Sequence, residues 1–472
     1  MDCCNKNKYD YDIAIMGSGS AAFAAAIKAT ELGKKVAIIE KSTLGGTCVN
    51  FGCVPSKTLI RAAETKHRAE NIPFEGISSK SVKVDFPTIM RQKSALVNEL
   101  RSGKYQSVLD NNENIQLIKG AAHFENQHVL NVDGRRVSAD KILIATGSST
   151  FVPAIEGLET VNYLTSKSAF ELDELPESIA IMGGGYIALE TAQMFSRLGS
   201  KVTIIPRSKI LSQEDNDISN WMTSYFESEG IQVLEHTEIS QVRESSKGIE
   251  LALKRNEEPL SKTFTRLLVA SGRRPNTKAL SLDAVGVKTD KNGAIYTDEY
   301  GQTSIENIYA AGDVLATPAL VYTAAYEGNL AAENAFLGNT RKTNYKVVPW
   351  VIFSDPQVAG LGLNEAQAKA EGIEYDVSKL SLDNVPRAIA ARDTRGFIKL
   401  LRKTGTQELI GARIIAPEGS ELLMELSLMM RYEIPISDIA KELHPYLTLS
   451  EGIKLAAQTF DKDVKSLSCC AS

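Results

Sequence analysis

Two stretches of the chain share one pattern of apolar and polar positions. In the first, the apolar residues 11–16 (YDIAIM) predict a buried strand, and an alanine-rich helix follows that ends near Gly33. A second strand is predicted at residues 35–39 and closes on Glu40. The turn between the first strand and the helix, GSGSAA at residues 17–22, has the form G-x-G-x-x-A. Strand, turn, helix and an acidic residue about 20 positions further on are typical of a βαβ unit that binds a dinucleotide.

The same pattern returns in the second stretch. Residues 178–182 (SIAIM) predict a strand, and GGGYIA at residues 183–188 forms the turn. The helix ends near Gly199, and residues 201–205 predict the next strand. In both units the first glycine permits a tight turn, the second lets the backbone approach a pyrophosphate, and the final small residue lets helix and strand pack closely. A glycine turn without a ligand is the alternative in each case.

The two units differ where each would contact a ribose. The first ends its second strand in Ile-Glu-Lys at residues 39–41, and the second ends in Ile-Pro-Arg-Ser-Lys at residues 205–209. A carboxylate accepts hydrogen bonds from a free 2′-hydroxyl but repels a 2′-phosphate, whereas Arg207 and Lys209 can neutralise that phosphate. We therefore expect NADPH rather than NADH in the second unit. The alternative is that Arg207 is a solvated surface residue.

Three further apolar segments end in small residues. They are residues 142–147 (ILIATG), 267–272 (LLVASG) and 307–313 (NIYAAGD). The first two predict strands at the crossing points between domains. The third ends in Asp313, at the carboxyl end of a strand, where open α/β sheets bind ligands. Residues 346–472 contain strand segments and two helical stretches without a glycine motif, which predicts a separate α+β domain.

Composition narrows the class of protein but names no function. A chain of 472 residues exceeds what one hydrophobic core serves, so we expect about two to four domains. A hydrophobic content of 43% and a charged content of 24% argue against disorder or a coiled coil. A net charge of -5 without a lysine or arginine run disfavours nucleic acid as a partner. Neither a signal peptide nor a membrane span is recognisable, which predicts a cytoplasmic protein.

The cysteines are the most informative residues. The six form three close pairs: Cys3 with Cys4, Cys48 with Cys53, and Cys469 with Cys470. A secreted disulfide framework would scatter more cysteines through a shorter chain, so the pairs indicate redox or soft-metal chemistry. A structural zinc site or unimportant exposed thiols are the alternative. The segment GGTCVNFGCVPSK at residues 45–57 follows the first nucleotide unit and leads into a helix, whose N-terminus would favour a thiolate.

This cysteine segment closely resembles the redox-active motif of the flavoprotein disulfide reductases, the class I pyridine nucleotide-disulfide oxidoreductase family, and the resemblance extends over essentially the whole chain. It implies an α/β fold with two Rossmann-like dinucleotide-binding domains, as in glutathione reductase, and a C-terminal α+β dimerisation domain that forms a homodimer. The implied order is an FAD domain at 1–150, an NADPH domain at 151–272, a central segment at 273–344 and the dimerisation domain at 345–472.

The resemblance also implies roles for individual residues. Cys53 would be the thiolate beside the flavin, and Cys48 the interchange thiol that faces the substrate. Lys57 would lie by the flavin and pair with Glu190, and Asp313 would contact the ribityl chain. The remaining positions assigned to the two cofactor sites are Gly17, Gly19, Ala22, Glu40, Ser42, Gly46, Thr47, Ala122, Gly147, Val321, Gly183, Gly185, Ala188, Arg207 and Lys209. For Ala22, Ser42, Thr47, Ala122 and Val321 the alternative is a packing role.

The C-terminal segment distinguishes this chain within the family. The family pattern His-x-His-Pro-Thr supplies a catalytic histidine, whereas this chain reads LHPYLTLSE at residues 443–451. Aligned on Thr-Leu-Ser-Glu, the histidine is replaced by Tyr446, whose ordinary pKa near 10 makes it a poor acid or base at neutral pH. Ordinary disulfide reduction is therefore disfavoured. A shifted alignment would restore His444 to the site.

The adjacent cysteines near the C-terminus suggest the substrate. Neighbouring Cα atoms lie about 3.8 Å apart, below the usual disulfide range of roughly 4.4 to 6.8 Å, so Cys469 and Cys470 should remain thiols. Two available thiolates suit a soft cation, because thiolate exchange moves the metal without releasing it. The arrangement is similar to that of the family members that reduce mercuric ion, Hg(II), in which the tail of one subunit delivers metal to the inner cysteines of the other. Tyr105 and Tyr446 match the two tyrosines that line the metal site there; half-buried aromatic packing is the alternative.

The resemblance thus implies NADPH-dependent reduction of Hg(II) to Hg(0) through FAD and the pair Cys48 and Cys53, with Cys469 and Cys470 as further metal ligands. Many such enzymes carry an N-terminal metal-binding domain, whereas this chain has a short leader in which Cys3 and Cys4 could capture metal or be accidental thiols. Two other functions remain as alternatives. The tail could serve a disulfide reductase as a dithiol shuttle, or the chain could sequester mercury or zinc without oxidising NADPH.

Overall fold

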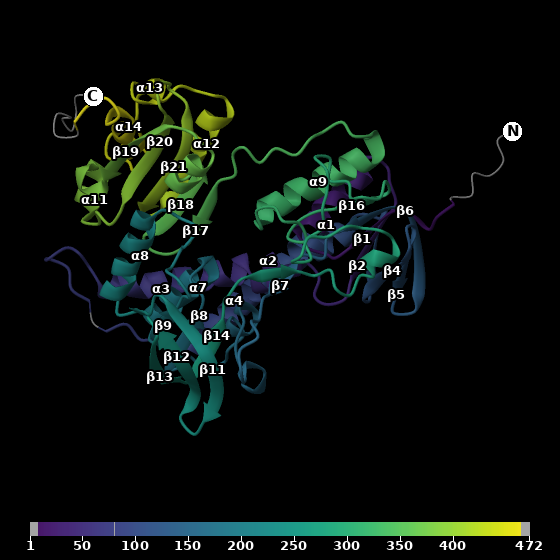
Figure 1. Cartoon of the computed structure of the whole chain (residues 1–472), viewed down its shortest axis with the longest axis horizontal. Coiled ribbons are helices and arrows are strands. Elements are labelled where there is room, and N and C mark those ends of the chain that lie inside the picture. The colour runs from purple at the N-terminus through teal and green to yellow at the C-terminus, as the bar shows by residue number, and fades with distance from the viewer. Residues whose placement is uncertain (1–7, 80, 464–472) are drawn as a thin grey trace.

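The computed structural model describes residues 8–79 and 81–463. Figure 1 shows the C-terminal part of the chain at the upper left, the N-terminal strands and helices at the right, and the second nucleotide unit below. The cysteines near the two termini, Cys3, Cys4, Cys469 and Cys470, lie outside the described residues. Among the residues that are described, we find no helix with the length and hydrophobicity needed to span a bilayer.

The first unit is a seven-stranded mixed sheet with order β3-β2-β1-β6-β5-β4, and β16 pairs with β6. Its strands are β1 (Tyr11–Met16), β2 (Val36–Glu40), β3 (Ile115–Lys119), β4 (Ala122–Asn126), β5 (Val129–Val132), β6 (Arg135–Ile144) and β16 (Ile308–Ala310). Its helices are α1 (Ser20–Glu31), α2 (Gly46–Phe51), α3 (Cys53–Glu70), α4 (Phe86–Arg101), α5 (Ser107–Asp110) and α9 (Val321–Leu337), with a π-helical turn at Ser102–Gln106. Strands β1, β2, β3, the end of β6 and β16 run parallel, as a dinucleotide-binding sheet requires.

The second unit combines a four-stranded parallel sheet of order β10-β9-β8-β14 with a three-stranded antiparallel sheet. Its strands are β8 (Ser178–Met182), β9 (Lys201–Ile205), β10 (Gln232–Val233), β11 (Thr237–Ser245), β12 (Gly248–Arg255), β13 (Glu258–Phe264) and β14 (Arg266–Val269). Its helices are α6 (Ser166–Ala169), α7 (Tyr186–Leu198) and α8 (Asn216–Ser228). The chain enters through β7 (Ser148–Thr150) and leaves through β15 (Arg273–Pro275), which pair with each other. The two connections between the units therefore lie side by side.

The C-terminal part is a five-stranded antiparallel sheet of order β17-β18-β21-β20-β19 covered by helices. Its strands are β17 (Trp350–Ile352), β18 (Gln357–Gly362), β19 (Tyr375–Ser381), β20 (Phe397–Lys403) and β21 (Leu409–Ala416). Its helices are α10 (Glu365–Ala370), α11 (Pro386–Ala391), α12 (Leu423–Arg431), α13 (Ile436–Ile439) and α14 (Glu451–Gln458). The predicted fold class is thereby confirmed. The exact domain boundaries at 150, 272 and 344 stay predictions.

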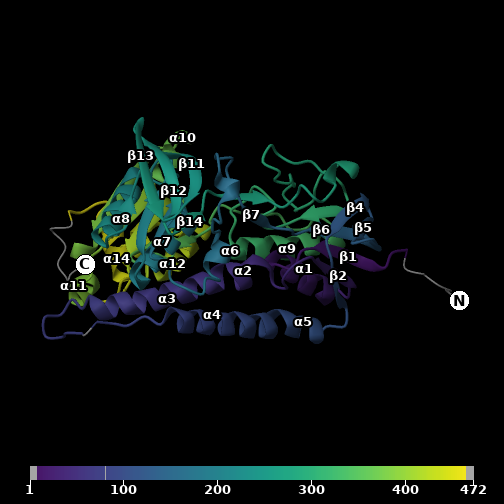
Figure 2. The ribbon, with the colours of Figure 1, turned by 90° about the horizontal axis from the view of Figure 1, so that it is seen from below.

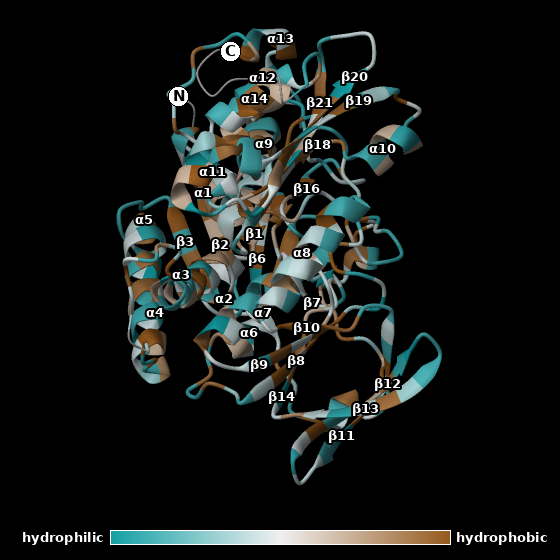
Figure 3. Cartoon of the chain, turned by 90° about the vertical axis from the view of Figure 1, so that its left-hand side faces the viewer, coloured by the Kyte–Doolittle hydropathy of each residue, from teal (hydrophilic) through white to brown (hydrophobic). Residues whose placement is uncertain are grey.

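Two long helices link the parts of the molecule. In Figure 2, α3 and α4 lie next to each other beneath the rest of the chain and follow its long axis. One apolar cluster includes Leu59 of α3, Met90 of α4, Phe195 of α7 and Phe397 of β20, so it crosses from the first unit through the second to the C-terminal sheet. Hydrophobic residues, brown in Figure 3, follow the central strands, while the hairpin tips of β11 to β13 are largely hydrophilic.

Buried ion pairs fasten the second unit to the C-terminal sheet. Lys399 on β20 is 0% exposed and donates to Asp215 and Glu365 over 2.8 Å each. Arg413 on β21 donates to Glu214 over 2.5 Å. Glu214 and Asp215 precede α8, so these contacts hold that segment in place. Removing one member of a buried pair leaves an uncompensated charge, which makes such contacts a strong constraint on how the units sit together.

Candidate active site

A cavity of about 560 Å³ lies where the three parts of the chain meet. The first unit contributes the glycine turn after β1, the end of β2 at Glu40 and the two cysteine-bearing helices α2 and α3. The second unit contributes the start of α7, and the C-terminal part contributes Val351 and Phe353. The sequence-predicted residues that line the cavity are Gly17, Gly19, Glu40, Gly46, Thr47, Cys48, Cys53, Lys57, Gly147, Glu190, Asp313 and Val321.

The glycine turn is shaped by close backbone contacts. Gly17 has φ +113°, and a Cβ there would lie 2.3 Å from the carbonyl oxygen of Ala145. A Cβ on Gly46 would lie 2.6 Å from the Cα of Gly19. Any side chain at these positions would separate β1, β6 and α2, so the sequence uses glycine where three segments converge. The turn leads directly into α1, whose first N–H groups face the cavity end and suit a phosphate.

Glu40 at the end of β2 is held by two donors. Ser18 Oγ donates to its Oε2 over 2.6 Å, and the backbone N–H of Ser42 donates to its Oε1 over 2.7 Å. Ser18 is buried at 1% exposed and also accepts a hydrogen bond from Gly45 N. The carboxylate is therefore fixed at the edge of the cavity, in the position from which it can accept hydrogen bonds from ribose hydroxyls.

The two cysteines face each other across the break between α2 and α3. Cys48 lies within α2, and Cys53 is the first residue of α3, with Gly52 as its N-cap. Pro55 falls in the first turn of α3, where a missing N–H costs nothing. Both cysteines are free thiols and half-buried. The short α2 and the long α3 thus place two sulfurs at one end of the cavity.

The two thiols have opposite acidities. The hydrogen bond from the Cys48 thiol and the Lys57 ammonium together lower the pKa of Cys53 from the ordinary value of 9.0 to about 7, against the effect of burial. The same hydrogen bond and burial raise the pKa of Cys48. Cys53 is therefore the thiolate of the pair near neutral pH, and Cys48 is the sulfur that keeps its proton.

Lys57 connects all three parts of the molecule. Its Nζ lies 2.8 Å from Glu190 Oε2 on α7, the pair that the family resemblance implied. The other carboxylate oxygen, Glu190 Oε1, accepts a hydrogen bond of 3.0 Å from the backbone N–H of Phe353. The Phe353 ring lies 4.7 Å from Lys57 Nζ, a cation–π distance. Glu190 is 7% exposed, so these contacts hold a buried carboxylate against a half-buried ammonium beside the thiols.

Tyr105 lies close to the cysteines, on the π-helical turn after α4. Its ring packs edge-on against Phe23 with centroids 4.9 Å apart. Burial raises the pKa of Tyr105, whereas a hydrogen bond with Ser20 lowers it. The phenol therefore stays protonated at neutral pH, and Tyr105 is not among the residues that line the cavity. A π-helical turn is a common feature of functional sites.

Asp313 reaches the opposite side of the cavity. It follows β16, and its Oδ2 accepts a hydrogen bond of 2.9 Å from Ser148 Oγ. Arg273 Nε lies 3.9 Å from the same oxygen and donates to Ser148 Oγ over 2.7 Å. Burial lowers the pKa of Arg273, while the Asp313 carboxylate raises it. Asp313, Ser148 and Arg273 therefore form a polar cluster where the chain passes between the first and second units.

The second glycine turn is built like the first but ends differently. Gly183 has φ +130°, and a Cβ there would lie 2.3 Å from Ala270 O. Gly184 packs directly on the end of β9, because a Cβ on it would lie 2.9 Å from Pro206 Cβ. Gly185 is the N-cap of α7, and Ala188 is fully buried in that helix. Arg207 is exposed, and Lys209 donates to Asn216. Cationic side chains therefore stand where the first unit has a carboxylate.

The residues of both units fit the nucleotides that such turns hold. The first unit offers a glycine cradle, a helix N-terminus and a fixed carboxylate along one continuous cavity that ends at two thiols, which suits FAD. The second offers a glycine turn and helix N-terminus followed by Arg207 and Lys209, which suits a nicotinamide dinucleotide. Tyr186, the first residue of α7, lines the cavity between the two units and stacks on Trp350 at 5.6 Å.

Several predicted residues lie elsewhere. Among the described residues that line the cavity, Ser42, Ala22 and Ala122 do not appear, and Ala22 is instead fully buried in the core between α1 and the sheet. Tyr446 is 51% exposed on the C-terminal part and is not in the cavity of its own chain. His444 Nε2 lies 2.8 Å from Glu425 Oε1, also in the C-terminal part.

Sequence reasoning missed several residues of the site. Ser148, Arg273 and Phe353 come from three different segments and belong to no motif of cofactor chemistry in the sequence, whereas Ser18 is an unassigned position within the first glycine motif. Only their position next to identified residues could have drawn attention to them. Tyr186 stands within the second glycine motif, so its place at the cavity follows from the motif itself.

Comparisons with known proteins agree with this geometry. The chain matches the pyridine nucleotide-disulphide oxidoreductase family over residues 11–328 and the dimerisation domain of the same family over residues 348–457. It is 47% identical over 467 residues to a mercuric reductase of Shigella flexneri, covering 97% of this chain and 82% of that protein. It is 44% identical over 467 residues to a mercuric reductase of Streptomyces lividans, covering 98% of each.

Solved structures are also similar. The HOCl-induced flavoprotein disulfide reductase RclA from Escherichia coli is 30% identical, with a TM-score of 0.83 over 94% of this chain and 98% of that one. The Cu(II) complex of the same protein is 30% identical, with a TM-score of 0.84 over 93% of this chain and 98% of that one. The similarity therefore extends through all three parts of the fold.

Proposed function

Because this chain belongs to the pyridine nucleotide-disulphide oxidoreductase family, we propose that it is an NADPH-dependent flavoenzyme that reduces Hg(II) to Hg(0) and so detoxifies mercury. The observation that carries the proposal is the pair Cys48 and Cys53 at the end of the cavity, with one thiol acidic and one not. Relatives at 42% to 47% identity are named mercuric reductases, which points to mercuric ion as the substrate.

The family implies FAD and a nicotinamide dinucleotide as cofactors. Bound FAD supplies two-electron chemistry between a nicotinamide and a pair of sulfurs. In the proposal, the glycine turn at 17–22, Glu40 and Asp313 hold FAD, and the turn at 183–188 with Arg207 and Lys209 holds NADPH. The corresponding domains are residues 1–150 with 273–344 for FAD, 151–272 for NADPH and 345–472 for dimerisation.

The chemistry of the thiols follows from their acidity. With a pKa of about 7, Cys53 provides a thiolate at neutral pH, and Lys57 stabilises that charge. Cys48 donates its proton to the hydrogen bond and loses it to solvent when Hg(II) binds, so that two thiolates bind the metal. Two electrons that originate from NADPH then reduce Hg(II) to Hg(0). Both Hg–S bonds break, and both sulfurs remain as thiolates.

The surroundings of the pair favour metal over disulfide reduction. Reducing a disulfide requires a proton donor for the leaving thiolate, whereas releasing Hg(0) requires none. The chain has a tyrosine where the family pattern has that histidine. Tyr105, which stays protonated beside Cys48, would instead contribute a neutral donor to the metal site.

The proposal assigns delivery of the metal to the C-terminal pair. The match to the dimerisation domain implies a homodimer. In that dimer Cys469 and Cys470 of one subunit would exchange Hg(II) with the inner cysteines of the other, and Tyr446 would join the partner subunit's metal site. Thiolate exchange keeps the metal bound throughout, which matters because free Hg(II) would bind any accessible thiol.

The test is NADPH consumption by the purified yellow protein in excess small thiol, with Hg(II), glutathione disulfide or lipoamide as the acceptor. We expect consumption with Hg(II) alone. Cys53→Ser should abolish it, and Cys469→Ala/Cys470→Ala should slow it, while the matched pair Cys3→Ala/Cys4→Ala should leave the rate unchanged. Consumption only with a disulfide would contradict the metal assignment and favour a disulfide reductase with a dithiol shuttle; the similar solved structure is named a flavoprotein disulfide reductase. No consumption would favour sequestration.

A further inference from the structure

Glu327 on α9 is a buried carboxylate that the proposed chemistry does not use. It is 3% exposed and lies in the middle of the helix that packs on α1. Burial raises its pKa, and hydrogen bonds from Tyr345, Gly312 and Thr317 lower it. A carboxylate placed in a protein interior is costly unless its oxygens are hydrogen-bonded, so these donors explain how Glu327 is tolerated.

The contacts of Glu327 lead to the flavin cavity. Its Oε2 accepts a hydrogen bond of 2.6 Å from the backbone N–H of Gly312. Gly312 and the next residue, Asp313, both line the cavity. The charge of Asp313 also acts on Glu327. A carboxylate that accepts from a backbone N–H forms a short, strong bond, so Glu327 fixes the peptide that carries Asp313.

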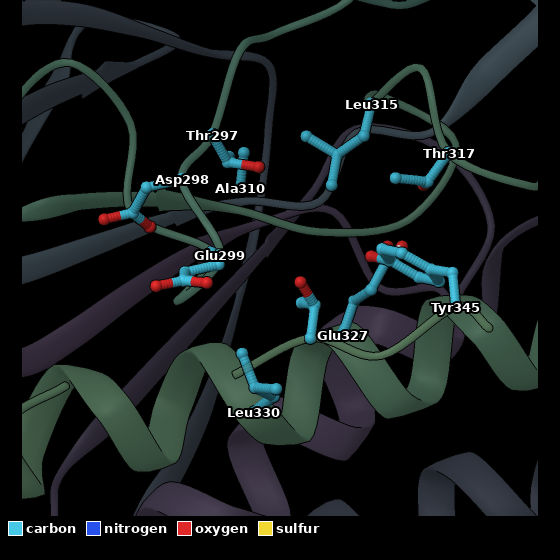
Figure 4. Close-up of a pocket in the computed structure, with 11 residues that line it drawn as sticks. Thr297, Asp298, Glu299, Ala310, Leu315, Thr317, Glu327, Leu330 and Tyr345 are labelled. Atoms are coloured by element: carbon cyan, nitrogen blue, oxygen red, sulfur yellow. The ribbon is translucent and has the colours of Figure 1, made fainter. Parts of the chain in front are cut away.

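A second contact fixes Glu327 itself. Tyr345 Oη donates to Oε1 over 2.7 Å. Figure 4 shows the Glu327 and Tyr345 side chains directed toward each other at one side of a smaller pocket of about 220 Å³, with Thr317 nearby. Tyr345 belongs to the segment between α9 and β17, which leads to the C-terminal part. Glu327 therefore lies between this pocket and the cavity of the cofactor.

We propose that Glu327 is a positioning residue for the flavin site, which holds Gly312 and thereby directs Asp313 into the cavity, while Tyr345 fixes the carboxylate. The inference rests on the FAD site of the proposed function. Glu327 does not line the cavity but lies behind its wall, where it supports the lining residues Gly312 and Asp313. It also connects the flavin site to the segment that joins the C-terminal domain.

The variants follow from the two hydrogen bonds. Glu327→Leu removes both acceptors, and Glu327→Gln keeps one oxygen for Gly312 N–H while its amide can donate to Tyr345 Oη. Tyr345→Phe removes only the outer bond. Glu333→Leu is the matched control, because Glu333 lies on the same helix and pairs over 2.7 Å with Arg341 of the same connecting segment, but not with Gly312.

The experiment measures FAD release from each purified holoenzyme by the fluorescence of free flavin, together with the midpoint potential of the bound flavin. Loss of a charge-assisted hydrogen bond should raise the FAD dissociation constant of Glu327→Leu by about tenfold or more and shift its potential. Tyr345→Phe should raise the constant by about two- to fivefold, and Glu327→Gln and Glu333→Leu should stay within about twofold. A merely structural role would lower thermal stability without moving the potential.

Unchanged FAD affinity and potential in Glu327→Leu would overturn the inference, as would an equal loss in Glu333→Leu. If Glu327→Leu does not fold, Tyr345→Phe serves as the test in its place. An FAD affinity and a flavin potential equal to those of the wild type in this variant would then overturn the inference. A wild-type protein that carries no flavin would instead overturn the proposed function on which the inference rests.

Discussion

The two nucleotide units have the same order of strand, glycine turn, helix and strand. The side chains at the end of their second strands, however, carry opposite charges. In the first unit, Ser18 and the backbone of Ser42 bind both oxygens of Glu40, so a negative charge is fixed at the cavity. In the second unit, Gly184 packs on Pro206, and the exposed Arg207 follows. The strand end of the first unit therefore carries a carboxylate that suits a ribose with free hydroxyls, and the strand end of the second carries a cation that suits an anion.

The fold thus supplies a glycine turn and a helix N-terminus in both units, whereas the residues at one strand end differ in charge. The units also differ in their connection to the thiols. The first carries Cys48 and Cys53 on its own helices, and the second contributes Glu190, which pairs with Lys57. Variants at Glu40, Arg207 and Lys57 separate the contributions of the two units.

The largest effect is expected at the fixed carboxylate of the first unit. Glu40→Leu removes the ribose acceptor and leaves Ser18 without its partner, so FAD affinity should fall by about a hundredfold, the loss expected for hydrogen bonds to a charged group. The measurement is FAD release from the purified protein. Glu31→Leu changes an exposed acid on α1 of the same unit and should have no effect. Equal losses in both variants would show that charge in the unit, not the position of Glu40, matters.

A smaller effect is expected at Arg207, which follows the second strand of the second unit. Arg207→Glu places a carboxylate where a 2′-phosphate would lie, so the ratio of kcat/KM for NADPH over NADH should fall by about thirtyfold or more. Steady-state rates with both nucleotides give this ratio. Arg266→Glu reverses the charge of another exposed arginine in the unit and should leave the ratio unchanged. An unaltered ratio in Arg207→Glu would remove Arg207 from the phosphate site.

The smallest effect is expected where the two units meet. Because Cys53 has a pKa of about 7, its thiolate forms as the pH rises through 7 and is lost below it. Lys57→Met removes a positive charge that favours the thiolate, so the pKa should rise by about one unit and the thiolate fraction at pH 6 should fall by about tenfold. The pH dependence of Cys53 alkylation measures this change. Lys66→Met, on the same helix but paired with Glu70, should leave the profile as it is in the wild type.

Much of this comparison could be predicted from the sequence. The strands expected at residues 11–16, 178–182 and 201–205 have those bounds in the structure, and the one expected at 35–39 begins and ends one residue later. These strands are buried apolar runs next to glycine turns, so local composition alone defines them. The segment at residues 45–57 is also expected to lead into a helix, and α3 begins within that segment at Cys53.

The contacts that complete the site could not be predicted in this way. Phe353 N and Glu190 are 163 positions apart in the sequence, and Ser148 and Asp313 are 165 apart. Such pairs depend on how whole units pack, which no local pattern encodes. Glu327 is similar, because a glutamate in an alanine-rich helix gives no sign that its carboxylate holds a backbone N–H 15 residues earlier.

In the proposed reaction, two electrons from NADPH reach Hg(II) through Cys48 and Cys53. The most direct test is to trap and quantify volatile mercury released by the purified protein while NADPH oxidation is followed in the same vessel. We expect one atom of Hg(0) for each NADPH oxidised, and none from Cys53→Ser with its flavin still bound. NADPH oxidation without release of Hg(0), or release that persists in Cys53→Ser, would contradict it.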